Sequence, residues 1–288
     1  MLIMLAVGLF TAGDALVKSL AQRYPITLLL WVRYGVQALA TILWLGPRLG
    51  SGLVRTPNLR LQLIRGVTLL GSSICFVSAL KWLPLADATA INYCTPVLVV
   101  LLSVLLLKER MTAARWMFVT AGFGGMLLIV RPGASILHGA ALLAFGCACF
   151  YAVYQMLTRR LRGDDPRVTL FYPALCGTLL MTAALPWFAP DAQMSWRDVG
   201  LTCVVGALAT IGHFFFILAF QRAPASGLTP FTYVQLVWAM IAGWLAFDQF
   251  PDAFSLSGIA IIGASGLWLA WHERRALSPA PQEPTAID

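Results

Sequence analysis

Charged residues are scarce in this chain. Asp, Glu, Lys and Arg make up only 11% of its 288 residues, whereas a soluble globular domain contains about 25%. Hydrophobic residues account for 59% of the sequence, and the mean hydropathy is +0.80. This composition excludes a soluble domain and predicts an integral membrane protein.

Several chemical motifs are also missing. No Lys follows a Gly, so the chain has no phosphate-binding Walker A loop and no ATPase of its own. The three histidines are far apart and the six cysteines form no CxxC pair, so no metal site is predicted. No nucleophile–base or carboxylate–metal set is visible. We therefore expect neither an enzyme nor a cofactor.

Long apolar segments dominate what remains. A helix needs about 20 mainly apolar residues to cross the hydrocarbon core, and ten segments meet that length. The predicted spans are Leu2–Gln22, Ile26–Gly46, Leu61–Trp82, Ala86–Leu107, Ala113–Val130, Gly139–Arg159, Val168–Phe188, Val199–Gln221, Ser226–Phe247 and Leu256–His272.

The net charge of +8 follows from topology rather than from a nucleic-acid partner. If the N-terminus is cytoplasmic, most Lys and Arg residues fall in cytoplasmic loops, as the positive-inside rule requires. We expect a multi-pass protein of the cytoplasmic membrane, surrounded by lipid, with both termini in the cytoplasm and no nucleic-acid partner.

The chain contains an internal repeat with an offset of 140 residues. At that offset Pro84 matches Pro224 and Tyr93 matches Tyr233. We interpret residues 1–132 and 138–272 as two copies of one unit, followed by a cytoplasmic tail at 273–288. Five spans per copy is an odd number, so the second copy enters the membrane from the opposite side. The predicted fold is an all-α membrane protein of ten helices, in two inverted five-helix repeats around a central cavity, as in secondary transporters.

Polar side chains inside the spans mark the candidate binding site. Unpaired amides and hydroxyls are costly in the membrane interior, so a hydrated cavity that accepts a small-molecule substrate explains them. For His213 an interhelical hydrogen bond is the alternative role. The candidate substrate-binding residues are Asn92, Tyr93, Thr95, Tyr151, Gln155, His213, Tyr233, Gln235 and Trp238.

Pro96 predicts a helix break in the fourth span. A proline cannot donate to the carbonyl four residues earlier, here that of Asn92. That carbonyl either faces the substrate, as in broken transporter helices, or is satisfied by a neighbour at a structural kink.

Three charged residues inside the spans are candidates for coupling or gating. Asp14 and Lys18 stand at i and i+4, the favourable order for a helix ion pair. Such a pair either anchors the first helix or opens and closes during transport. Arg33 binds an anionic substrate group, pairs with Asp14 or extends to the interface.

The fifth and tenth spans are rich in glycine, and small residues permit close helix contact. Packing or a homodimer through these helices is expected, with a monomer as the alternative. The glycines are Gly122, Gly124, Gly125, Gly258, Gly263 and Gly266.

The stretch Ala79–Pro132 resembles the half-repeat of the EamA family of the drug/metabolite transporter superfamily. The marks are the Pro84 turn, the Thr95–Pro96 pair, Glu109 after the fourth helix and the glycine-rich fifth helix. The second copy matches less well, because Leu236 replaces the helix proline and Asp248 replaces the glutamate.

Within that superfamily the chain is most similar to bacterial YddG-like exporters. This resemblance implies that the first, third, fourth, sixth, eighth and ninth helices surround a substrate cavity. It also implies export of amino acids or related small metabolites across the bacterial inner membrane by alternating access. The alternatives are export of drugs or of other metabolites such as nucleosides, or a facilitative channel. A channel would need rings of charge or a carbonyl filter, and neither is visible.

Overall fold

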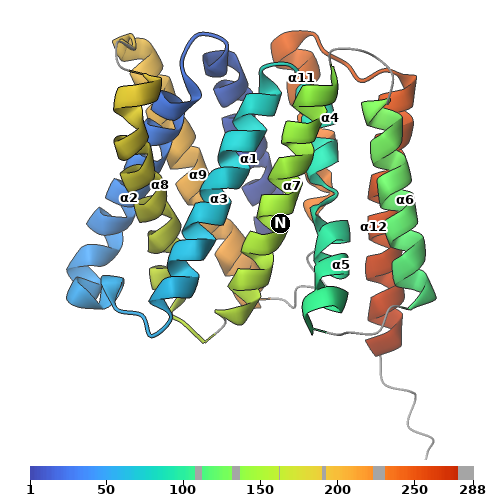
Figure 1. Ribbon diagram of the computed structural model, residues 1–288, viewed down its shortest axis with the longest axis horizontal. Helices are drawn as coiled ribbons and strands as arrows, with labels where there is room; N and C mark the ends of the chain where they lie inside the picture. The colour runs from blue at the N-terminus through green and yellow to red at the C-terminus, as the bar shows by residue number, and fades with distance from the viewer. Residues whose placement is uncertain (108–111, 132–136, 162, 190–192, 223–230, 278–288) are drawn as a thin grey trace, which may run out of the picture.

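The computed structural model describes residues 1–288 except 108–111, 132–136, 162, 190–192, 223–230 and 278–288. Its helices stand side by side in one bundle (Figure 1). They are α1 Leu2–Ala21, α2 Ile26–Leu49, the 3-10 helix η1 Gly50–Val54, α3 Leu59–Leu80, α4 Leu85–Asn92, α5 Thr95–Leu107, α6 Ala113–Val130, α7 Leu137–Arg160, α8 Pro166–Phe188, α9 Trp196–Arg222, α11 Val234–Phe247 and α12 Ala253–Leu277.

Within the described residues, nine helical stretches are long and apolar enough to cross a membrane. α11 is apolar but shorter, and part of the ninth predicted span, residues 226–230, lies outside the described residues. α12 continues to Leu277, beyond the predicted end of its span at His272. The prediction of a helical membrane protein is confirmed, while the count of ten and the inverted repeat stay predictions.

The fourth predicted span is interrupted halfway. α4 ends at Asn92 and α5 begins at Thr95. Because Pro96 has no N–H, a continuous helix here would leave the Asn92 carbonyl without a donor. The Thr95 hydroxyl donates to that carbonyl at 2.7 Å. The carbonyl is therefore satisfied by a neighbouring side chain and is not left open for a substrate.

α6 and α12 pack against each other at one edge of the bundle (Figure 1). Their backbones meet at Gly125 and Gly258, where a Cβ added to Gly258 would lie 2.5 Å from the Gly125 carbonyl oxygen. Only glycine allows this approach. The glycine-rich helices thus have a packing role within the chain, and a homodimer through them stays a prediction.

The other helices enclose the centre of the bundle. α1 packs against α9 and α3 against α7, while α2 and α8 pair at the edge opposite to α6 and α12. Large apolar side chains such as Leu43, Leu142 and Leu179 are exposed on the sides, as contact with lipid requires.

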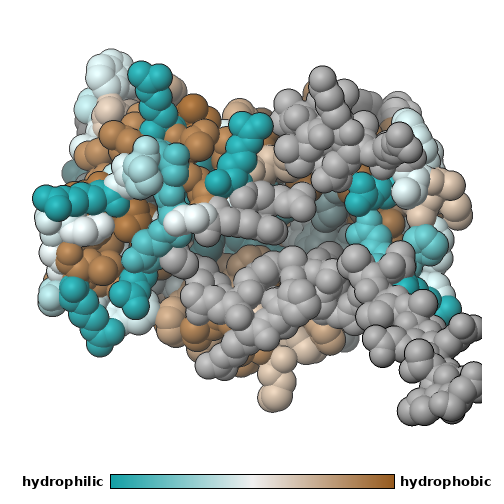
Figure 2. Space-filling view, turned by 90° about the horizontal axis from the view of Figure 1, so that it is seen from below, coloured by the Kyte–Doolittle hydropathy of each residue, from teal (hydrophilic) through white to brown (hydrophobic). Residues whose placement is uncertain are grey.

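Hydrophilic side chains gather at the lower end of the bundle. Figure 2 shows them over the side that α2, α3 and α8 form. Exposed arginines at this end of the bundle include Arg48, Arg55, Arg60, Arg160 and Arg167.

Candidate functional site

A cavity of about 210 Å³ lies in the centre of the bundle. Its walls come from α1, α3, α4, α5, α7, α9 and α11, and α2 contributes Arg33. The spans that the family resemblance places around a cavity all reach it. The resemblance does not place α2 at the cavity, whereas the sequence itself offered Arg33 of this helix as a candidate to bind an anionic substrate group.

The structure brings most of the predicted site residues together around this cavity. Apolar rings of Phe10 and Phe76 stand beside the polar groups, so the wall offers both hydrogen bonds and apolar contact. The predicted residues that line it are Asp14, Arg33, Asn92, Tyr93, Thr95, Pro96, Tyr151, Gln155, His213 and Gln235.

Tyr233 lies behind this wall. Its ring is 5.1 Å from that of Tyr93, and its hydroxyl packs against Gly266 of α12. The Tyr93 hydroxyl donates to the Thr232 carbonyl at 2.5 Å. Tyr233 is 5% exposed and does not line the cavity. It supports Tyr93 rather than contacting a ligand.

Trp238 also lies outside the cavity, in contrast to its predicted role. It is 42% exposed and lines a separate apolar groove between α1 and α11, next to Gly8. Three residues turn a helix by roughly 300°, so Trp238 points in a direction roughly 60° away from that of Gln235. Gln235 therefore reaches the cavity, whereas Trp238 points toward the gap between α1 and α11.

The predicted ion pair between Asp14 and Lys18 does not form. The Lys18 ammonium donates to the carbonyl of Leu83 at 2.5 Å and lies 5.3 Å from the centre of the Phe247 ring. The long lysine stem reaches the turn between α3 and α4, which offers a carbonyl oxygen. Lys18 therefore joins α1 to that turn, and the predicted pairing was wrong.

Asp14 and Arg33 face the cavity, and neither side chain forms a direct ion pair with a described residue. Among the described residues, no ion pair within 4.0 Å involves either side chain. The Nε atom of Arg33 is buried and has no hydrogen-bond partner. The expected pairing of Arg33 with Asp14 is thus absent, and both groups remain open to a ligand.

His213 is held by its own helix. Its Nδ1 lies 2.7 Å from the Ala209 carbonyl, and a carbonyl can only accept, so Nδ1 carries the proton. The ring also stands edge-on to Phe10 at 4.8 Å. In the neutral tautomer Nε2 is then a hydrogen-bond acceptor.

A chain of side chains that sequence reasoning missed orients Asn92. The Cys147 thiol donates to Asn92 Oδ1 at 3.3 Å, and Ser72 Oγ lies 3.2 Å from the same sulfur. Cys147 and Ser72 both line the cavity. Cys147 therefore has a polar role here.

Arg65 is the largest omission from the sequence-based site. It is 4% exposed, and its guanidinium donates to Tyr154 Oη, Thr158 Oγ1 and the Thr169 carbonyl, each at 2.7 Å. The Tyr154 ring stacks on Tyr151 at 5.4 Å. Arg65 therefore supports a wall of the cavity from behind, and a lone charge within an apolar span was the signal for it.

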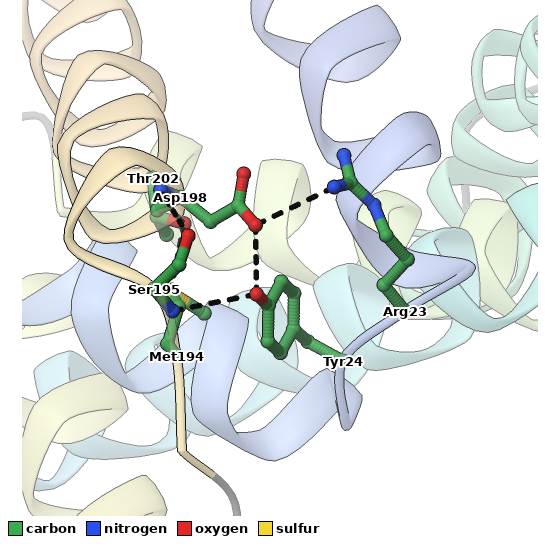
Figure 3. Close-up of polar contacts among 6 residues, drawn as sticks. All are labelled: Arg23, Tyr24, Met194, Ser195, Asp198 and Thr202. Atoms are coloured by element: carbon green, nitrogen blue, oxygen red, sulfur yellow. Dashed lines mark hydrogen bonds and ion pairs between the residues drawn. The ribbon is translucent and has the colours of Figure 1, made fainter.

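A polar cluster, here called the upper joint, lies at the end of the bundle opposite the five exposed arginines named above (Figure 3). Tyr24, between α1 and α2, donates its hydroxyl to Asp198 Oδ2 at 2.7 Å, and Arg23 Nη1 lies 3.4 Å from the same oxygen. Ser195 accepts from the Asp198 N–H, and Thr202 donates to the Asp198 carbonyl. The upper joint binds the α1–α2 turn to the start of α9.

A second cluster, the lower joint, binds the α7–α8 turn to the start of α3. Asp164 accepts hydrogen bonds from Thr56 Oγ1 and Asn58 Nδ2 at 2.7 Å, and from Gln62 Nε2 at 3.0 Å. Burial alone would raise the pKa of Asp164, but these three hydrogen bonds together hold it below its usual range. Asp164 is therefore ionised at neutral pH.

The site holds polar and aromatic groups rather than reactive ones. Within the part of the chain that the structure describes, no group of three His, Cys, Asp or Glu residues could hold a metal ion. The arrangement can bind and release a small molecule through hydrogen bonds, two opposite charges and aromatic contacts.

Comparison with known proteins connects this architecture to transport. The chain is 25% identical to an S-adenosylmethionine uptake transporter of Rickettsia conorii over 80% of its length and 78% of the relative's. It is 28% identical to a riboflavin transporter of Rhizobium johnstonii, over 86% and 82%. It is 26% identical to a pseudopaline exporter of Pseudomonas aeruginosa, over 91% and 92%.

A solved crystal structure has the same fold, with a TM-score of 0.69, 21% identity and coverage of 96% of this chain and 98% of that one. The model of the EamA-like transporter family matches residues 1–131 and again residues 138–271. The chain is a membrane transporter and belongs to the EamA-like transporter family.

Proposed function

We propose that this protein is a secondary transporter that exports amino acids or related small metabolites across the bacterial inner membrane by alternating access. The central cavity is the observation that carries this proposal. Helices from both segments that match the family enclose it, and amides, hydroxyls and aromatic rings line it. Buried polar groups without partners are costly, and a substrate that pairs with them stabilises the cavity.

The size of the cavity favours a small substrate. Pockets for drug-sized ligands span about 300–1,000 Å³, and this cavity measures about 210 Å³. An amino acid suits that space better than a nucleoside or a flavin does. The relatives named above carry different molecules, and both uptake and export occur among them, so larger metabolites are the second candidate class.

The contact between Tyr93 and Tyr233 supports two inverted repeats of five helices each. The two residues are related by the 140-residue offset, and their rings touch at 5.1 Å. Equivalent residues of two repeats touch where a two-fold axis passes between them. The arginines at the lower end support a cytoplasmic location for that end, and the last described residues of α12 lie at the same end (Figure 1), which supports a cytoplasmic C-terminus.

Counterflow into proteoliposomes tests the function. Vesicles that contain the purified protein and an unlabelled solute are mixed with labelled amino acids, nucleosides or cationic drugs, without nucleotide triphosphate. We expect saturable accumulation of an amino acid. If only nucleosides or drugs accumulate, the protein is a transporter of that class rather than of amino acids. If no solute is transported saturably, the proposal is wrong.

Two variants test the site in the same assay. Asn92→Ala and Gln155→Ala each remove a cavity hydrogen bond, worth about 0.5–1.5 kcal/mol, so we expect the half-saturation concentration to rise about twofold to tenfold. Trp244→Phe, on the exposed face of α11, is the control and should leave it unchanged. Unchanged affinity in both cavity variants, with the fold intact, would place the site elsewhere.

A further inference from the structure

The central cavity contains one acidic and one basic side chain that form no direct ion pair with each other. Asp14 comes from α1 and Arg33 from α2. No ion pair within 4.0 Å joins them to each other or to another described charge, and Arg33 Nε is buried without a hydrogen-bond partner. Charges without a direct ion-pair partner are unfavourable in a protein interior, and a ligand with two opposite charges would pair with both side chains.

We propose that Asp14 and Arg33 recognise the zwitterionic head group of an α-amino acid. Arg33 binds the carboxylate, for which the guanidinium has a matching planar geometry, and Asp14 binds the ammonium group. The proposal rests on the transport function above and goes beyond it, because it assigns the chemical groups of the substrate that are recognised and the two residues that recognise them.

The rest of the cavity suits the remainder of such a ligand. Phe10 and Phe76 offer an apolar surface, and Asn92, Gln155 and Gln235 offer amides. A ligand with only one of the two charges would leave the other side chain unpaired. Because a hydrogen bond to a charged group is worth about 1.5–3 kcal/mol, we expect such a ligand to bind at least about tenfold more weakly.

Competition by a matched series of solutes tests the assignment. Phenylalanine, phenylalaninamide, which lacks the carboxylate, and 3-phenylpropionate, which lacks the ammonium group, compete against transport of the best labelled solute. In the native protein only phenylalanine should compete well. Arg33→Gln should abolish the preference over the amide, and Asp14→Asn should abolish the preference over 3-phenylpropionate.

Conservative and control variants separate recognition from folding. Arg33→Lys keeps the positive charge but lacks the planar guanidinium that can bind both carboxylate oxygens, so it should give intermediate selectivity. Arg48→Gln on α2 and Asp248→Asn after α11 make the same chemical changes at exposed positions, and should keep native selectivity. Melting temperatures of all variants verify that each is folded.

The outcomes distinguish this assignment from the transport function. If the protein transports a solute saturably but prefers phenylalaninamide or 3-phenylpropionate to phenylalanine, the zwitterion assignment is wrong and the transport function stands. The same holds if folded Arg33→Gln and Asp14→Asn keep native selectivity. If no solute is transported at all, the proposed function itself fails.

A second inference rests on a different observation, the two joints. At the 140-residue offset Tyr24 corresponds to Asp164, and Asn58 corresponds to Asp198. Tyr24 donates to Asp198 at one end of the bundle, and Asn58 donates to Asp164 at the other, both at 2.7 Å. Equivalent positions of the two repeats thus make equivalent contacts at opposite ends.

We infer that the upper and lower joints are the two gates of the transporter, and that they open alternately. Each joins a turn between two helices to the start of a third through a few polar contacts. Such contacts can be broken and remade at small cost, as a change between two conformations requires.

Accessibility of a cysteine in the cavity tests this inference. Leu69→Cys, at a lining position, is introduced into a chain without its native cysteines and labelled by a membrane-impermeant thiol reagent from either side. Asp198→Asn should raise labelling from one side and Asp164→Asn from the other. Asp252→Asn, which disrupts a contact with Arg131 outside both joints, should change neither. Equal or unchanged labelling in folded joint variants would overturn the assignment.

Discussion

We expect Arg65→Met to destabilise the protein, because Arg65 donates a hydrogen bond to the Thr169 carbonyl, which Pro173 leaves without its usual helical donor. Pro173 lies inside α8 and has no N–H for the carbonyl of Thr169, four residues earlier. Arg65, on α3, supplies that donor through Nη1 at 2.7 Å. Methionine keeps much of the side-chain volume but leaves the carbonyl without a donor.

The expected loss follows from the contacts of the guanidinium. A buried acceptor without a donor costs about 1–3 kcal/mol. The Tyr154 and Thr158 hydroxyls lose a donor too, but Thr158 already donates to the Tyr154 carbonyl at 2.7 Å. Burying methionine, unlike burying arginine, costs no desolvation of a charged group. This gain offsets the hydrogen bonds that the Tyr154 and Thr158 hydroxyls lose. We therefore expect the free energy of unfolding to fall by about 1–3 kcal/mol.

Pro173→Ala provides the test, since alanine restores the N–H that the Thr169 carbonyl lacks. In detergent, the melting temperature of Arg65→Met should fall, and adding Pro173→Ala should recover much of the loss. Pro186→Ala, also inside α8, restores an N–H elsewhere and should recover none of it. Purely additive effects of Arg65→Met and Pro173→Ala would refute the account, because independent sites add while coupled sites do not.

Three further outcomes are expected. Gly258→Ala should force α6 and α12 apart, because its Cβ would lie 2.5 Å from the Gly125 carbonyl oxygen, and thermal unfolding should show a loss of about 1–3 kcal/mol; a native melting temperature would contradict that close contact. Thr95→Val should lower stability by about 1–3 kcal/mol, since the Asn92 carbonyl loses its donor, whereas Thr95→Ser should be nearly neutral; equal losses would point to packing instead. Asp164 has a lowered pKa, so the stability it contributes is complete above its unfolded-state pKa of about 3.9 and is lost as the pH falls through the folded-state value; an Asp164→Asn variant should lack this acid-dependent loss, and an identical pH profile would refute the assignment.

Features set by the local sequence could be predicted. The length of each apolar segment located the spans, because a helix in lipid must pair its backbone N–H and C=O groups with one another. Pro96 marked the interruption between α4 and α5, since the missing N–H is a property of the residue itself. Polar residues inside the spans pointed to the cavity, because the membrane gives them no other favourable place.

Features that depend on contacts between distant parts of the chain could not be predicted from the sequence. Lys18 bonds to the backbone carbonyl of Leu83, and no sequence pattern records such an acceptor. Trp238 lies near Gln235 on α11, but only the position of α1 decides which of the two faces the cavity. Arg65 has partners on α7 and α8, and their proximity to α3 is a result of folding.

The two proline interruptions differ in what they tie together. At Pro96 the freed carbonyl of Asn92 accepts from the hydroxyl of Thr95, three residues later, so this acceptor needs no donor from another helix. At Pro173 the freed carbonyl is satisfied by Arg65 of α3, so α8 cannot move away from α3 without losing that hydrogen bond. The first interruption is bridged within its own span, whereas the second joins α8 to α3 beside the lower joint, because Thr169 also accepts a hydrogen bond from Gln62.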